Sequence, residues 1–402
     1  MDSRMEIMTE SVSTQELERR WKSVRDRMKE EGIDCLVIQN DNEWVGGYVR
    51  WFTDVPGKNA SPFTVLFPVD DEMTTITQGG ASGGKSPGDF GPPAWTLRGV
   101  RRRLTAPFFR SLIYTTRYDA ELAVDALKVK EKGKIGIVGK GSMSAVFYEH
   151  LLKGLPRATI VESSDLVDEI KAIKSDEEIS LIKKTAALQD EAMGYAREVI
   201  RPGRKDSEIA ADITHKVIDL GSEEQIVMAG SGPLGTPVPM RKRRFQNRVV
   251  REGDQFTLMI EVNGPGGMYT EIGRVFFVGH RVPSVLEDAF EAVKETQKVT
   301  LRLLKPDADP GEIWRANNAF LIQKGFPPEA RLYAHGQGYD LVERPALRED
   351  EPMKLKSKMN ITVHPVIGTD RVWVWVCDNY LITDSGVSEC LHRTPQQIFA
   401  VG

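Results

Sequence analysis

The stretch EGDQFTLMIEVNGPGGMYTEIGRVFFVG, residues Glu252–Gly279, decides the fold of the second half of this chain. Two runs rich in β-branched and aromatic residues flank the segment Asn263–Gly267, which holds three glycines and one proline. This pattern predicts a β-hairpin. Glu261 and Glu271 are ten residues apart, an even number, so the alternation of side chains along the strands places both carboxylates on one face.

Two carboxylates on one face of a hairpin have chemical consequences. They repel each other, so the pKa of one of them should rise. Such a pair can share a proton, or it can bind a guanidinium, amidine or ammonium group. The simpler explanation is that Glu261 and Glu271 are strand residues held in ordinary salt bridges, and the residues of the hairpin alone favour it.

A duplicated pattern lies on both sides of this hairpin. Arg201-Pro202 is followed six residues later by Glu208-Ile209, and Lys305-Pro306 is followed six residues later by Glu312-Ile313. The two copies are 104 residues apart without a gap, and each lies between two helix-like stretches. This arrangement predicts a helix–loop–helix unit present twice, related by pseudo-twofold symmetry.

The first half alternates helix-like and strand-like runs, which predicts an α/β domain with a largely parallel sheet. The runs are helices at Thr14–Gly32, Ala120–Lys128 and Ser144–Leu155, and strands at 33–40, Thr64–Pro68, Met73–Thr77, Lys134–Val138 and 158–163.

Ser175 and Glu178 form a capping-box pattern that predicts a helix from Asp176 to Ile200. We therefore expect two domains, at residues 1–168 and 169–402. The Gly/Pro-rich stretch Gly79–Pro93 is interpreted as a surface or interface loop.

Six motifs occur in order over roughly residues 170–390. They are the duplicated unit, the hairpin, IKSDEE (Ile173–Glu178), AHGQGYDLVERP (Ala334–Pro345), NITVHPVIG (Asn360–Gly368) and VCDNYLITDSG (Val376–Gly386). Together they resemble the creatinase/aminopeptidase P/prolidase family. The resemblance implies an α/β N-terminal domain followed by an α+β "pita-bread" catalytic domain with an internal pseudo-twofold repeat. It also implies a homodimer in which the N-terminal domain of one subunit closes over the site of the other.

The resemblance further implies where the active site lies. Peptidases of this family bind two divalent metal ions through two Asp, one His and two Glu. The matching positions here carry Glu261, Glu271, His335, His364 and Cys377. Only two of the five are carboxylates, and each is one methylene longer than aspartate. A site that needs ligands placed to within about half an ångström would be disturbed by this change.

These departures favour a metal-independent hydrolase or lyase that acts on a small polar substrate at a non-peptide C–N bond, as the resemblance to creatinase implies. His335 would be the general acid or base, Glu261 and Glu271 would bind and polarise the substrate, and His364 would assist. No cofactor is expected under this hypothesis. The residues expected to contact the substrate are Tyr269, Tyr339, Glu343, Asp378 and Arg241.

Two alternatives stay open. In the first, one divalent metal ion is retained, because imidazole and thiolate ligands suit a single softer ion, and the chain is a mononuclear hydrolase or an Xaa-Pro peptidase-like enzyme. Its ligands would come from Glu261, Glu271, His335, His364 and Cys377. In the second, the chain is a catalytically inactive binding protein. Charged and imidazole residues at ligand positions argue against this second alternative.

Composition narrows the classes of partner. The net charge of −4 and the pI near 6.0 argue against a dedicated nucleic-acid or acidic-membrane binder. The basic run Arg241–Arg244 is interpreted as a solvated or dimer-facing surface, with Arg241 also a candidate ligand for a substrate carboxylate. The three cysteines lie far apart, and the polar N-terminus lacks an apolar signal segment, so we expect a cytoplasmic protein.

Overall fold

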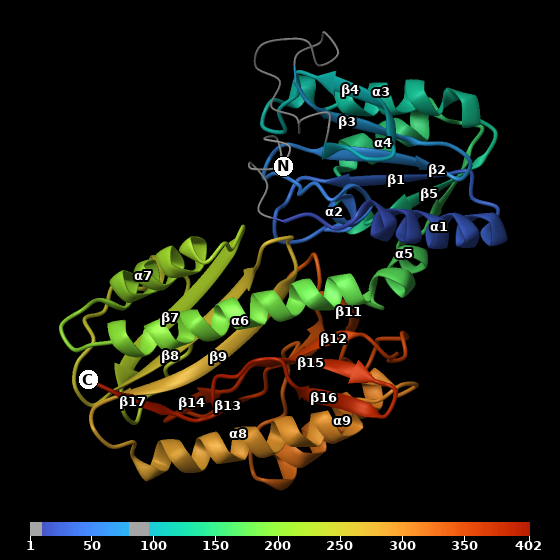
Figure 1. Ribbon diagram of the computed structural model, residues 1–402. Helices are drawn as coiled ribbons and strands as arrows, with labels where there is room; N and C mark the ends of the chain where they lie inside the picture. Colours follow the sequence, from blue (N-terminus) through green and yellow to red (C-terminus); the bar gives the residue numbers. More distant parts are fainter. Residues whose placement is uncertain (1–9, 80–95) are drawn as a thin grey trace. The chain divides into compact units, whose positions relative to one another are not determined.

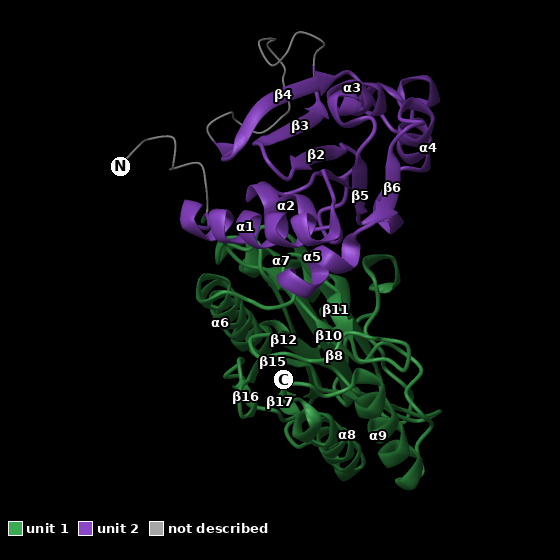
Figure 2. Ribbon diagram, turned by 90° about the vertical axis from the view of Figure 1, so that its right-hand side faces the viewer, with its two compact units in different colours: residues 1–10, 172–402 green, residues 11–171 purple. Residues whose placement is uncertain are grey.

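The computed structural model of this chain describes residues 10–79 and 96–402. It divides into two compact units, one of Ser11–Lys171 and one that contains Ala172–Gly402 (Figure 2). The boundary between the units lies after residue 171, whereas the sequence predicted it after residue 168. The reason is that helix α5 (Ser164–Lys171) belongs wholly to the first unit. Residues 80–93 of the predicted Gly/Pro-rich loop lie outside the described residues.

The N-terminal unit is built on a six-stranded sheet of order β4-β3-β2-β1-β5-β6. Its strands are β1 (Cys35–Asn40), β2 (Phe63–Pro68), β3 (Met73–Gln78), β4 (Val100–Ala106), β5 (Lys134–Val138) and β6 (Thr159–Glu162). The predicted largely parallel sheet is only partly right, because β1–β2 and β2–β3 are antiparallel pairs. The four residues between β2 and β3 are enough for a hairpin but too few for a parallel crossover.

Helices complete this unit: α1 (Thr14–Glu31), α2 (Tyr48–Thr53), α3 (Tyr118–Leu127), α4 (Ala145–Gly154) and α5, with short 3₁₀ turns η3 (Ile113–Thr115), η4 (Lys128–Lys130) and η5 (Lys140–Ser142). Helix α1 begins at the cap Ser13 and ends at Gly32, whose φ of 66° is left-handed. Glycine adopts this conformation without strain, which is why the helix stops where the sequence predicted.

The C-terminal unit contains the predicted repeat. Each copy is a long helix followed by a shorter one: α6 (Asp176–Val199) with α7 (Asp206–Asp219), and α8 (Ser284–Leu303) with α9 (Pro310–Gln323). Ser175 and Glu178 form the expected capping box at the start of α6. Helices α6 and α7 cover one side of the strands, and α8 and α9 cover the other (Figure 1). The fold is therefore the expected pita-bread arrangement.

Each helix pair is followed by a sheet. The first has the order β17-β9-β8-β7 and the second the order β11-β10-β12-β15-β16, while β13 and β14 form a separate pair. The strands are β7 (Gln225–Pro233), β8 (Asp254–Asn263), β9 (Tyr269–Val278), β10 (Ala334–Gly336), β11 (Glu343–Ala346), β12 (Asn360–Val363), β13 (Val366–Gly368), β14 (Trp373–Trp375), β15 (Asp378–Thr383), β16 (Gly386–Cys390) and β17 (Phe399–Val401), with a 3₁₀ turn η6 (Arg243–Phe245).

Two strand-rich stretches of the C-terminal unit are each divided in the structure. Lys358–Val366 is interrupted at His364-Pro365, where proline has no N–H to continue the ladder. Arg371–Thr383 is interrupted at Cys377. This residue instead pairs with Gly273 of β9 through two backbone hydrogen bonds of 3.1 and 3.3 Å. This bridge joins the two sheets and places residues of β9 next to those that begin β15.

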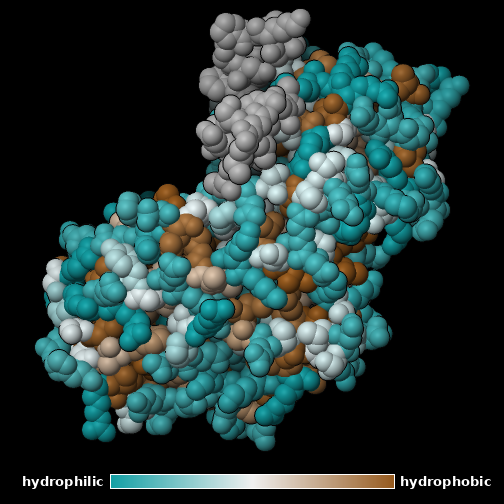
Figure 3. Space-filling view, in the orientation of Figure 1, coloured by the Kyte–Doolittle hydropathy of each residue, from teal (hydrophilic) through white to brown (hydrophobic). Residues whose placement is uncertain are grey.

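The surface of the chain is mostly polar. Figure 3 shows hydrophilic residues over most of the visible face, with hydrophobic ones scattered among them. None of the helices in the described ranges is long and apolar enough to cross a membrane.

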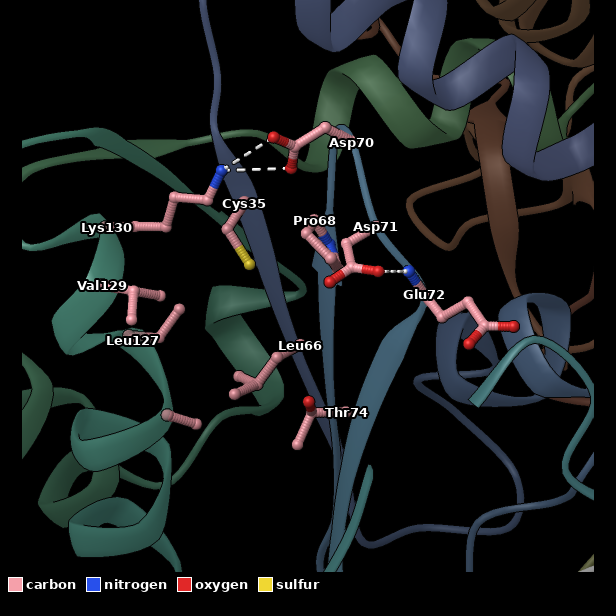
Figure 4. Close-up of a pocket in the computed structure, with 11 residues that line it drawn as sticks. Cys35, Leu66, Pro68, Asp70, Asp71, Glu72, Thr74, Leu127, Val129 and Lys130 are labelled. Carbon is pink, nitrogen blue, oxygen red and sulfur yellow. Dashed lines mark hydrogen bonds and ion pairs between the residues drawn. The ribbon is translucent and has the colours of Figure 1, made fainter. Parts of the chain in front are cut away.

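A cavity of about 280 Å³ opens in the N-terminal unit beside β1 and β2 (Figure 4). Cys35 contributes to its lining, and burial raises the pKa of this thiol to about 12. Asp70 at its rim is paired with Lys130 at 3.0 Å. The thiol is therefore a poor nucleophile, and this cavity offers no evident chemistry.

Candidate active site

The two glutamates of the hairpin face each other. Glu261 on β8 and Glu271 on β9 are direct cross-strand partners, and both side chains are buried. Burial raises the pKa of Glu261 well above its ordinary value, and the charge of Glu271 raises it further. Burial also raises the pKa of Glu271, to about 7. Two desolvated carboxyls at paired strand positions are most stable when they hold one proton between them.

Two histidines complete the cluster. His335 lies on β10, His364 directly follows β12, and their ring centroids are 5.2 Å apart. Nε2 of His364 is 4.0 Å from Oε2 of Glu271 and has no hydrogen-bond partner among the described residues. Nδ1 of His335 is 3.0 Å from the carbonyl oxygen of Gly336, which can only accept, so Nδ1 carries a hydrogen and Nε2 a lone pair.

Both imidazoles are uncharged near neutral pH. Burial lowers the pKa of His335 to about 4. Burial lowers the pKa of His364 well below its ordinary value, and the nearby His335 lowers it further. The two neutral rings can therefore bind a metal ion or accept a hydrogen bond, but they are weak bases and carry no positive charge to balance the glutamates.

Two buried amides that the sequence reasoning missed hold the glutamates in place. Nε2 of Gln337 donates to Oε1 of Glu261 at 2.9 Å, while its Oε1 accepts from Nδ2 of Asn379 at 2.9 Å. Oδ1 of Asn379 accepts from the backbone N–H of Glu271 at 2.8 Å. Gln337 lies inside the motif Ala334–Pro345, but an uncharged amide gave no reason to select it.

Cys377 lies next to the cluster as a protonated thiol. Its Sγ is 3.4 Å from the carbonyl oxygen of Glu271 and 3.3 Å from Oγ1 of Thr362. Burial raises the pKa of the thiol well above its ordinary value, and the charge of Glu271 adds to this. The thiolate form that would bind a metal ion or attack a substrate is therefore disfavoured.

The carboxylates of two predicted substrate contacts, Asp378 and Glu343, are bound by other buried side chains. Asp378 accepts from Nη2 of Arg274 at 2.8 Å and lies 3.2 Å from Nδ1 of His392 in the fully buried interior. Glu343 forms a buried ion pair of 2.6 Å with Lys174. Buried charges need such partners, so both residues have structural roles.

The other three predicted contacts are two buried tyrosines and one exposed arginine. Tyr269 and Tyr339 are buried, and the N–H of Tyr269 donates to the carbonyl oxygen of Gly338 at 2.7 Å. Arg241 is exposed and pairs with Ala229 of β7. Its side chain packs over Gly230, four residues along β7 from the partner of Glu261, or about 13 Å at the rise of a strand. Arg241 therefore packs against β7 several residues away from the strand partner of Glu261.

Comparison with known proteins agrees with this arrangement. Residues 180–384, just over half of the chain, match the model of a family described as metallopeptidase family M24. The chain belongs to metallopeptidase family M24. The match begins within α6, ends directly after β15 and includes every residue of the glutamate–histidine cluster.

Relatives of this M24 member carry several names. This chain is 28% identical over 306 residues to an uncharacterised hydrolase/peptidase of Sinorhizobium fredii. The aligned part covers 71% of this chain and 73% of that protein. It is 26% identical to an Xaa-Pro dipeptidase of Pyrococcus horikoshii, over 64% of this chain and 73% of that one. It is 28% identical to an ectoine hydrolase of Halomonas elongata, over 64% and 67%. The solved prolidase of Thermococcus sibiricus shares the fold, with a TM-score of 0.79, 17% identity and coverage of 97% and 100%.

M24 peptidases generally use two metal ions, and the residues of the cluster decide how many ions can bind here. Glu271, His335 and His364 each offer a ligand atom, and these atoms lie within 4.8 Å of one another. Ligands of one ion are about 3–4 Å apart, so small side-chain movements would let the three bind a single ion. The unpartnered Nε2 of His364 supports this fit. A second ion does not fit, because Cys377 is a protonated thiol and Oε1 of Glu261 is already bound by Gln337.

Proposed function

We propose that this M24 member is a hydrolase that cleaves a C–N bond of a small substrate and uses at most one metal ion. The observation that carries the proposal is the cross-strand pair of Glu261 and Glu271 beside two neutral imidazoles. This set offers proton donors and acceptors in a desolvated site, where acid–base catalysis is effective. It does not offer the carboxylates that a dinuclear centre needs.

In this mechanism, Glu261 is the group that moves a proton. Gln337 donates to Oε1 of Glu261, so the transferable proton is carried by Oε2 or by Glu271. When the shared proton is on Glu271, the ionised Glu261 takes a proton from the attacking water through Oε2 and passes it to the leaving nitrogen. The lone pair on Nε2 of His335 offers a second acceptor close to Glu271. A metal ion bound by Glu271, His335 and His364 would supply polarisation of the substrate and a lowered pKa for a bound water.

A metal-free form of the same reaction is the second candidate. Two carboxyls beside two uncharged imidazoles carry a net negative charge, which suits a substrate with a delocalised cation such as an amidine or guanidinium. The similarity to an ectoine hydrolase and the resemblance to creatinase support substrates of this kind. The similarity to an Xaa-Pro dipeptidase supports the metal-dependent form, with a dipeptide as substrate.

The test is a panel of three compounds, alanyl-proline, ectoine and creatine, assayed with protein never exposed to chelator and with the same protein after chelation. We expect hydrolysis of at least one compound and its loss in Glu261→Gln. Activity that chelation removes selects the one-metal form, and activity that survives chelation selects the metal-free form. Hydrolysis that persists in Glu261→Gln would overturn the role given to the glutamate pair.

A further inference from the structure

Arg331 lies beside the histidines of the candidate site and has no role in the mechanism described so far. It precedes His335 by four residues, and its Nη2 donates to the backbone carbonyl of His364 at 3.2 Å. Its side chain is 43% exposed, whereas that of His364 is only 9% exposed. Arg331 is thus at the boundary between the buried cluster and solvent.

A buried carboxylate fixes the orientation of this guanidinium. The side chain of Glu329 is 6% exposed and accepts from Nε of Arg331 at 3.0 Å and from Nη2 at 2.6 Å. Glu329 is itself held by its N–H, which donates to Oδ1 of Asn318 at 2.7 Å. One edge of the guanidinium is therefore engaged, while Nη1 has no hydrogen-bond partner among residues 10–79 and 96–402.

A held arginine with one free amino group is a preorganised anion ligand. Its side chain loses little conformational freedom on binding, and its planar shape matches a carboxylate. Burial dominates the pKa shifts of Glu271 and His364, and the positive charge of Arg331 acts on both as well, so its field reaches the cluster. A carboxylate fits better than a phosphate, because a second negative charge would be repelled by the glutamate pair.

We propose that Nη1 of Arg331 binds a carboxylate of the substrate, so that the compound cleaved in this site is an acid. Arg331 is then a specificity residue, and Glu329 positions it. The inference rests on the proposed function for the location of the substrate, but not for the reaction. Every compound of the panel carries a carboxylate, so the inference concerns which residue of this chain binds that group.

The test compares an acid with its neutral counterpart. Binding of alanyl-proline and of alanyl-prolinamide is measured by calorimetry in a Glu261→Gln background, so that turnover does not interfere. We expect the acid to bind about tenfold more tightly than the amide, as a charge-assisted hydrogen bond at a partly exposed site allows. Arg331→Met should remove this difference by weakening only the acid, and Glu329→Gln should reduce it.

Arg248→Met is the matched control, because Arg248 is also held by a buried carboxylate, that of Asp254, in the same unit. It should leave the preference for the acid unchanged. Equal binding of acid and amide, binding of neither, or a preference that survives Arg331→Met would overturn the inference. A preference that depends on Arg331 in a protein that cleaves none of the panel compounds would keep the inference and reject the proposed reaction.

Discussion

Gln337 donates a hydrogen bond of 2.9 Å to Oε1 of Glu261, and this contact sets the chemistry of the glutamate pair. The amide orientation is fixed, because Oε1 of Gln337 accepts from Asn379 while its Nε2 also donates to the carbonyl of Leu341 at 3.1 Å. Oε1 of Glu261 therefore cannot be the protonated oxygen. The proton that the pair shares is carried by the opposite oxygen or by Glu271.

Replacement of Gln337 by leucine should impair the reaction more than it impairs the fold. The change removes the donor to Glu261 and leaves Nδ2 of Asn379 without one acceptor. A lost hydrogen bond to a charged group costs about 1.5–3 kcal/mol, so kcat/KM should fall by roughly 10- to 100-fold. Gln255→Leu is the control, since Gln255 is also a buried glutamine of this unit, bonded to the carbonyl of Trp373 at 2.6 Å. Equal losses of kcat/KM in both variants would show that Gln337 only stabilises the fold.

The bridge between the two sheets should depend on the absence of a side chain at Gly273. A Cβ at this position would be 2.2 Å from the ring of Trp375, so Gly273→Ala forces the indole or the strand to move. Overpacking of this kind costs about 1–3 kcal/mol, which a lower urea midpoint would reveal. Gly194→Ala is the matched control, because a Cβ there meets nothing within 4 Å on helix α6. It should be neutral or stabilising by up to about 1 kcal/mol.

The stability of the N-terminal unit should fall as the pH rises through the range in which Asp119 titrates. Burial raises the pKa of Asp119 to about 6, above the ordinary value of 3.8. Between these values the folded state binds more protons than the unfolded state, so the free energy of unfolding decreases with increasing pH and stays lower above the folded pKa. Urea midpoints at about pH 4 and about pH 7 measure this loss.

Asp119→Asn should make that loss smaller, because asparagine does not titrate. Asp125→Asn, an exposed change on the same helix, is the control and should leave the pH dependence as it is. An identical pH dependence in the wild-type protein and in Asp119→Asn would show that Asp119 is not the group responsible.

Parity along the strands explains much of what the sequence could predict. The even spacing of Glu261 and Glu271 placed them on one face, and the structure pairs them directly. The same rule places the side chain of Asp378 on the opposite face from that of Cys377. Gln337 and Asn379 are 42 residues apart and contact each other through uncharged amides. No local sequence pattern predicts a contact of this kind. The two antiparallel strand pairs of the N-terminal sheet were missed because β-strand periodicity carries no information on strand direction.

Several expectations stay predictions. The resemblance implies a homodimer, and light scattering of the purified chain measures it directly. Three further expectations are also predictions: a small-molecule substrate, the absence of nucleic-acid and membrane partners, and a cytoplasmic location. The Arg241–Arg244 run is exposed, as a solvated or dimer-facing surface would be.

The most direct test of the account is the metal content of the purified protein, never exposed to chelator or added metal, measured beside His364→Ala. The account predicts no more than one ion per chain, and any ion found should be lost in His364→Ala, because His364 belongs to the one cluster of the described residues that suits a single ion and lies beside the glutamate pair. Two ions per chain would contradict it, since Glu261 and Cys377 would then have to act as ligands despite the hydrogen bond from Gln337 and the protonated thiol.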